Sequence, residues 1–196
     1  MQSHQTDEQL ISGYLQGNNN CFEQLLNRHK NKIFTYILLT VKDRDLAEDL
    51  FQDVFVKVIT TLNKGTYNEE GKFLSWVMRV AHNRVIDHFR RDIKMQFVDN
   101  PEEGDDFDIF KFLVYEEKNA EEKIMEAQTA VEIRYMVEQL PYEQKEVLLM
   151  RHYGKMSFRE IAAMTNVSIN TCLGRMRFAI AKLRKMMEEK EARMAA

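Results

Sequence analysis

Apolar residues recur at helical spacing along most of the chain, and sustained alternating runs rich in Val, Ile and Thr are absent. In the N-terminal half the pattern predicts a short helix over 10–15 and a second from 21 to about 40. A third follows a cap at Asp43–Asp45, with Leu46, Leu50, Val54 and Val58 on its apolar side, and a fourth runs from 73 to about 91. The sequence therefore predicts an all-α protein.

Residues 157–185 have the pattern of a helix-turn-helix. Ser157 and Glu160 have the spacing of a capping box, and Ser168 can cap a second helix. Between them, Asn166 tolerates the left-handed conformation that a tight turn needs. In the second helix the predicted buried stripe consists of Ile169, Cys172, Met176, Ala179 and Leu183.

The opposite face of this second helix carries groups that can contact DNA. Arg can pair with guanine, Asn with adenine, and Lys can neutralise phosphate. An amphipathic core helix with a solvated basic face is the alternative. However, Pro141–Met187 holds nine Lys or Arg against three Glu, a net charge of +6 in a chain whose total is −3, which favours DNA. The residues of this face are Asn170, Thr171, Gly174, Arg175, Phe178 and Lys182.

An acidic stretch separates this basic segment from the N-terminal half. Asp92–Glu122 contains eleven acidic residues and three Lys, a net charge of −8, and its turn-forming residues indicate a linker. A solvated spacer is the simplest interpretation. We therefore predict two small helical domains, residues 1–95 and 125–196, joined by an acidic linker over 96–124.

The fourth predicted helix mixes aromatic and basic residues. Lys72–Arg91 has five basic residues and one acidic residue, a net charge of +4, and includes Trp76, the only tryptophan. Aromatic and basic groups together suit unpaired nucleic acid, whose bases stack while its phosphates meet cations. On residue pattern alone, we interpret Phe73, Trp76 and Val80 as core and the Arg, Asn and His side chains as a nucleic-acid face.

Other classes of protein find little support. The sequence lacks the layout of a signal peptide, an apolar run long enough to span a bilayer, and a phosphate-binding glycine loop. Cys21 and Cys172 are predicted to be reduced core thiols. Glu48, Asp49 and Asp53 could in principle hold a metal, but an exposed acidic face explains them better. We expect a cytoplasmic protein that is not an enzyme, with no catalytic residues, cofactor or metal.

Three stretches resemble the bacterial sigma-70 family, within its short extracytoplasmic-function subgroup. Residues 21–26 with 45–57 are similar to region 2, residues 72–91 resemble the promoter-melting and −10 segment, and residues 140–184 resemble region 4, which reads the −35 element. The order and spacing of all three make the match specific. A helix-turn-helix repressor or activator would explain only the last stretch, and the sequence shows no dimerisation heptad.

The resemblance implies a factor that joins core RNA polymerase through the beta-prime clamp and beta flap, directs it to promoter DNA and helps to open the duplex. It implies an anti-sigma factor as a partner, and no small-molecule substrate or insertion into a membrane. Implied core-polymerase contacts are Asp49, Gln52, Asp53, Phe55 and Lys57. Implied −10 contacts are Tyr67, Lys72, Phe73, Trp76, Arg79, Asn83, Arg84, Asp87, His88 and Arg91. Implied −35 contacts are Arg159, Ser168, Asn170, Thr171, Gly174, Arg175, Arg177, Phe178 and Lys182.

The recognition helix departs from the family pattern at two positions. Many relatives have Lys and Ser where this chain has Leu173 and Gly174, which removes a cation and a hydroxyl. Glycine inside a helix costs about 1 kcal/mol relative to alanine, and close approach of the backbone to DNA is one reason to keep it. If Arg175 contacts guanine, its replacement by alanine should weaken −35 discrimination by about 1–3 kcal/mol.

Overall fold

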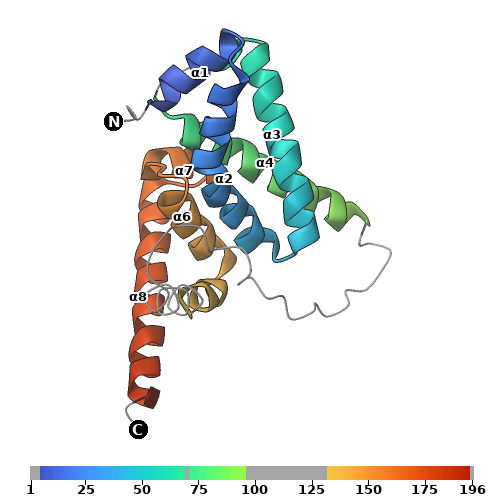
Figure 1. Ribbon diagram of the computed structural model, residues 1–196. Helices are drawn as coiled ribbons and strands as arrows, with labels where there is room; N and C mark the ends of the chain where they lie inside the picture. The colour runs from blue at the N-terminus through green and yellow to red at the C-terminus, as the bar shows by residue number, and fades with distance from the viewer. Residues whose placement is uncertain (1–4, 69–70, 96–131, 195–196) are drawn as a thin grey trace. The chain divides into compact units, whose positions relative to one another are not determined.

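The computed structural model describes residues 5–68, 71–95 and 132–194, and within these ranges it contains helices and no strand, which confirms the all-α prediction (Figure 1). Its helices are α1 (Asp7–Leu15), α2 (Asn19–Val41), α3 (Arg44–Asn63), α4 (Phe73–Met95), α6 (Tyr142–His152), α7 (Phe158–Thr165) and α8 (Ile169–Met194). Residues 132–138 are also helical.

The described residues form two compact units. Helices α1–α4 group with residues 150–157, and 132–149 group with 158–194. The predicted linker, 96–124, lies outside the described residues, so the predicted domain limits stay a prediction.

Helix α1 is fixed to α2 by one carboxylate. Asp7 accepts a hydrogen bond from Arg28 at 2.6 Å and contacts Nε2 of His29 at 2.7 Å. Thr6 and Gln9 form a capping box that starts the helix before Leu10, where the apolar pattern had placed it. The Thr-x-x-Gln signal was present in the sequence and would have given the correct start.

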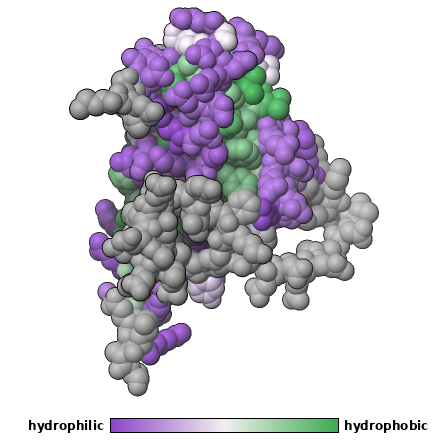
Figure 2. Space-filling model, in the orientation of Figure 1, coloured by the Kyte–Doolittle hydropathy of each residue, from purple (hydrophilic) through white to green (hydrophobic). Residues whose placement is uncertain are grey.

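The core of the first unit surrounds α2, which packs against α1, α3 and α4, while α3 also packs against α4. On the face seen in Figure 2, hydrophilic side chains cover much of this unit and an apolar band lies between them. One polar pair is buried in the core, because the Tyr36 hydroxyl lies 3.1 Å from Nδ1 of His82. The fully buried apolar side chains include Leu25, Ile33, Ile37, Val54, Val58, Val77, Ala81 and Val85.

Helix α3 begins as predicted. The Asp43 side chain caps it by accepting a hydrogen bond from the Leu46 backbone at 2.9 Å. Leu50, Val54 and Val58 are buried as the four-residue spacing requires. The acidic residues between them therefore point away from the core.

The helix-turn-helix forms in the second unit with the predicted turn. Asn166 has φ of 55°, in the left-handed region, and the Val167 backbone donates to the Ala162 carbonyl at 3.0 Å. Ser168 caps α8 by accepting from the Thr171 backbone at 3.0 Å. The capping box between Ser157 and Glu160 stays a prediction.

The buried stripe of α8 differs from the predicted one at its first position. Cys172 and Ala179 are buried and Met176 is half-buried, but Ile169 is 43% exposed. Ile169 is the first residue of the helix, where one turn of chain is missing above it, and it lies about 60° around the helix from Cys172. Both Cys172 and Cys21 are free and buried, as expected for core thiols.

Candidate nucleic-acid interfaces

Three aromatic rings meet where the loop before α4 joins the helix. The Tyr67 ring lies 4.4 Å from Trp76 and 6.1 Å from Phe73, and Phe73 lies 5.8 Å from Trp76. Gly71, with φ of 68°, turns the chain into the helix. Tyr67 and Trp76 are half-buried, so part of each ring remains accessible.

Phe73 belongs to the core. Its side chain is only 2% exposed and packs beside the His29 ring at 5.7 Å. A buried ring cannot meet a base, so the resemblance-based assignment of Phe73 to the DNA surface is corrected, and the residue-pattern interpretation as core holds. Phe73 instead packs from the core side against the rings of Tyr67 and Trp76.

An exposed strip runs along α4 from this aromatic cluster. Lys72, Arg79 and Asn83 are exposed and, with Trp76, fall at intervals of three or four residues, so they share one face. Arg90 continues the strip two turns further and is also exposed. It was missed as a site residue, although its spacing from Asn83 would have identified it.

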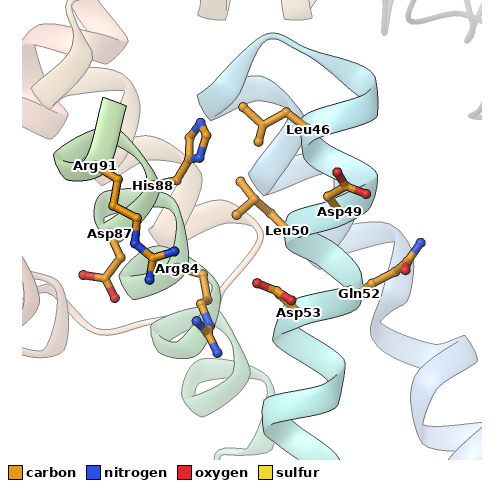
Figure 3. Close-up of a pocket in the computed structure, with 9 residues that line it drawn as sticks. All are labelled: Leu46, Asp49, Leu50, Gln52, Asp53, Arg84, Asp87, His88 and Arg91. Atoms are coloured by element: carbon orange, nitrogen blue, oxygen red, sulfur yellow. The ribbon is translucent and has the colours of Figure 1, made fainter. Parts of the chain in front are cut away.

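The remaining predicted −10 residues face α3 instead. A pocket of about 460 Å³ lies between the two helices, with Leu46 and Leu50 among its lining residues (Figure 3). Asp49, Gln52 and Asp53 line it from α3, and Arg84, Asp87, His88 and Arg91 line it from α4. The structure therefore brings two sets that the sequence had assigned to different partners into one mixed-charge pocket.

The outer face of α3 is acidic with one apolar residue. Asp49, Gln52 and Asp53 are exposed, and so is Lys57 at the edge of the face. Val56 is 63% exposed one turn beyond Gln52, and it was not among the predicted contacts although its spacing from Gln52 places it on this face. Phe55 is the reverse case: it is buried in the core beside Phe51 at 4.7 Å, so its assignment to the polymerase surface is corrected.

On α8 the predicted DNA face is exposed, but two of its polar groups are engaged within the protein. The Thr171 hydroxyl lies 2.9 Å from the Ser168 hydroxyl, and Lys182 donates to the Gln139 carbonyl at 2.8 Å. Asn170, Arg177 and Phe178 are exposed, as is Arg159 on α7. Gly174 is half-buried.

The charge of Arg175 acts on α6. Arg175 is half-buried, and its charge acts on Glu146, a buried carboxyl that also accepts a hydrogen bond from the Tyr142 hydroxyl at 3.2 Å. Burial raises the pKa of Glu146, while the Tyr142 hydrogen bond and the Arg175 charge lower it again. An arginine whose charge offsets a buried acid contributes to the domain as well as to any contact with bases.

Among the described residues, every helix is too short or too polar to cross a bilayer. Their His, Cys, Asp and Glu side chains form no group of three or more that could hold a metal ion.

Comparison with known proteins finds two matching family regions. Residues 25–93 match the family Sigma-70 region 2, and residues 130–183 match Sigma-70, region 4. The chain belongs to the sigma-70 family, in its extracytoplasmic-function subgroup. It is thus a transcription initiation factor that directs core RNA polymerase to promoters.

Individual relatives match this chain over most of its length. RNA polymerase sigma factor YlaC of Bacillus subtilis (strain 168) is 26% identical over 173 residues, covering 86% of this chain and 95% of that protein. ECF RNA polymerase sigma factor SigW of the same strain is 21% identical over 174 residues, covering 88% and 92%.

Two solved structures share the fold. CnrH in complex with the cytosolic domain of CnrY has a TM-score of 0.57 at 21% identity and covers 93% of this chain and 97% of that chain. The sigma factor RpoE in complex with the anti-sigma factor NepR, from Bartonella quintana, has a TM-score of 0.61 at 16% identity and covers 85% and 96%.

Proposed function

We propose that this sigma factor divides its tasks between residues 1–95, which dock on the beta-prime clamp and hold the −10 element, and residues 125–196, which read the −35 element, with 96–124 joining them. The observation that carries this assignment is the pair of faces on α3 and α4. One is acidic and exposed, the other is basic and aromatic, and both belong to one unit while the helix-turn-helix occupies another.

The clamp contact is assigned to the outer face of α3. Asp49, Gln52 and Asp53 supply charge and hydrogen-bond acceptors around the exposed side chain of Val56. A small apolar centre within a charged rim is the usual composition of a protein interface. Lys57 lies at the rim, and Arg84, His88 and Arg91 extend the same surface across the pocket.

The −10 contact is assigned to the exposed strip of α4 and the aromatic pair at its start. Tyr67 and Trp76 offer the accessible part of their rings to an unstacked base, at about 1–3 kcal/mol per stacked base. Lys72, Arg79 and Arg90 supply phosphate contacts along the strip, and Asn83 supplies an amide.

These contacts position the polymerase and the promoter without a metal, a cofactor or a chemical reaction catalysed by the factor. We therefore propose that the factor is not an enzyme and that it acts in the cytoplasm with the polymerase.

A protein partner is assigned to an apolar seam on α8. Ile169, Leu173, Ile180 and Met187 are all exposed, and with Met176 and Leu183 they recur at intervals of four and three residues. That repeat is the spacing of a helix that packs along another helix. We assign this seam to the beta flap of core polymerase, with Met187→Asp expected to weaken core binding and leave binding to −35 duplex unchanged, because Met187 lies beyond the last predicted −35 contact, Lys182.

An inhibitory partner is also part of the proposal. CnrH and RpoE were each solved with a bound partner, the cytosolic domain of CnrY and the anti-sigma factor NepR. The shared fold supports an anti-sigma factor for this chain.

Transcription with purified core polymerase on a promoter library tests the assignment. Asp49→Arg should lower core affinity and transcript yield by at least tenfold, because it places a cation in the acidic face. Glu23→Arg, which reverses an exposed charge on α2 of the same unit, is the matched control and should have little effect. Equal loss in both variants, or transcripts that start without defined −10 and −35 sequences, would refute the proposal.

A further inference from the structure

Gly174 and Phe178 lie one turn apart on the exposed face of α8, and the fold explains neither. Phe178 is 65% exposed, although a phenyl ring gains most from burial. A Cβ added to Gly174 would meet nothing within 4 Å, and its backbone does not have the positive φ that favours glycine. Alanine would therefore fit at position 174 and would stabilise the helix by about 1 kcal/mol.

Polar groups on the same face are already engaged. The Thr171 hydroxyl is paired with the Ser168 hydroxyl, and the charge of Arg175 acts on Glu146. Between Thr171 and Lys182 this face exposes the ring of Phe178 beside the side chain of Arg177, and the bare backbone of Gly174 lies one turn before Phe178. Gly174 and Phe178 thus form an apolar patch within this DNA face.

We propose that Phe178, with the space left open at Gly174, contacts the C5-methyl group of a thymine in the −35 element. This inference rests on the proposed function, in which α8 enters the major groove. Thymine is the base that presents a methyl group there, and apolar side chains are its usual partners. The factor is therefore selective for a T·A pair at one −35 position, read through van der Waals contact.

The position of that pair follows from the helix. Phe178 lies eight residues after Asn170, about 12 Å along the axis at 1.5 Å per residue. With base pairs stacked about 3.4 Å apart, that separation corresponds to about three to four steps. An adenine contacted by Asn170 and the thymine contacted by Phe178 should be separated by that number of steps.

The surroundings of Phe178 favour DNA over a protein partner. Lys182 and Lys185 follow it on the same face, one and two turns on, and both are exposed cations. The exposed apolar seam assigned to protein contact lies on a different side of the helix. An isolated apolar group within a cationic face fits a base edge flanked by phosphates.

The test uses the complete sigma factor bound to core polymerase. Selection from promoters with a randomised −35 region gives the preferred sequence, and each thymine in it is then replaced by uracil, which lacks only the methyl group. At one position the change should lower promoter affinity about fourfold, which corresponds to about 0.8 kcal/mol for one buried carbon group. Phe178→Ala should bind thymine and uracil promoters equally, and Gly174→Ala should reduce the difference.

Tyr135→Ala is the matched control, since Tyr135 is an aromatic residue of the same unit with 66% exposure. It should keep the fourfold difference, and circular dichroism verifies that all three variants fold. The inference is overturned if no −35 thymine responds to loss of its methyl group, or if Phe178→Ala keeps the response. It is also overturned if Phe178→Ala lowers core affinity instead. Failure of the unmodified factor to select any −35 sequence would instead refute the proposed function.

Discussion

Replacement of Arg175 by alanine tests whether this side chain reads DNA or supports the domain. The structure indicates that Arg175 supports the domain, because its charge offsets that of Glu146, which is only 8% exposed. An exposed ion pair contributes about 0–1 kcal/mol, and breaking a fully buried pair costs about 3–5 kcal/mol. Because the influence of Arg175 on Glu146 is electrostatic and Arg175 is only half-buried, we expect Arg175→Ala to lower the free energy of unfolding of the second unit by about 1 kcal/mol.

The loss should depend on pH in a defined direction. Burial raises the pKa of Glu146, so the folded chain retains a proton that the unfolded chain releases, and stability falls as pH rises through the folded pKa. The Arg175 charge lowers that pKa and limits the fall. Without Arg175 the penalty for the ionised carboxylate increases, so the variant should be close to the parent at pH 4.5 and clearly weaker at pH 7.5.

Urea unfolding at these two pH values measures the effect. Trp76, the only tryptophan, reports on the first unit alone, while circular dichroism follows both units, so the first unit acts as an internal reference. Arg177→Ala removes an exposed arginine of the same helix and should cost less than about 0.5 kcal/mol. In a Glu146→Gln background, Arg175→Ala should lose most of its cost.

The same variant should bind every −35 sequence more weakly by a similar factor, with its base preference unchanged. The reasoning is refuted if stability is unaffected at both pH values while discrimination is lost at one base pair. That result would restore Arg175 as a reader of guanine.

Two further predictions concern a buried histidine and a helix cap. Burial lowers the pKa of His82 to about 4, so the contribution of the neutral side chain to stability is complete above pH 6.5 and is lost as pH falls toward 4. The urea midpoint followed by Trp76 fluorescence should decrease over this range, and His82→Gln should flatten the decrease. Ser168→Ala removes the cap that accepts a hydrogen bond from the Thr171 backbone and should lower the free energy of unfolding by about 1 kcal/mol. Hydrogen exchange should increase in the first turn of α8, and −35 affinity should fall without a change in base preference. Unchanged exchange in that turn would contradict the assigned cap.

Local signals in the sequence predicted most of the helices, since caps and apolar spacing act over a few residues. Asp43, Asn166 and Ser168 take the roles that their side-chain chemistry predicts. The structure differs from the resemblance-based assignment of contacts at Phe55. Phe55 is buried and Val56 is exposed, as helical spacing indicates, because Phe55 lies four residues after Phe51 and three before Val58, whereas Val56 lies four after the exposed Gln52.

The candidate site was harder to predict from the sequence. Arg175 and Glu146 are 29 positions apart, and only the packing of α8 against the preceding helices brings their charges together. Likewise, the pocket that joins Asp53 to Arg84 depends on how α3 packs against α4. A sequence lists the groups available for binding, but the fold decides which of them are already occupied by each other.

The two faces of α8 determine which partners can compete for this helix. Successive residues turn by about 100°, so the apolar seam from Ile169 to Met187 lies about 150° around the helix from the face of Asn170 and Phe178. DNA in contact with the second face leaves the first accessible, and the 26 residues of α8 are long enough to serve both. A protein that covers only the seam therefore has no steric reason to displace the −35 duplex. If the seam binds the beta flap, an inhibitor that uses it must compete with the polymerase, and its effect should decrease as core polymerase is added and not as promoter DNA is added.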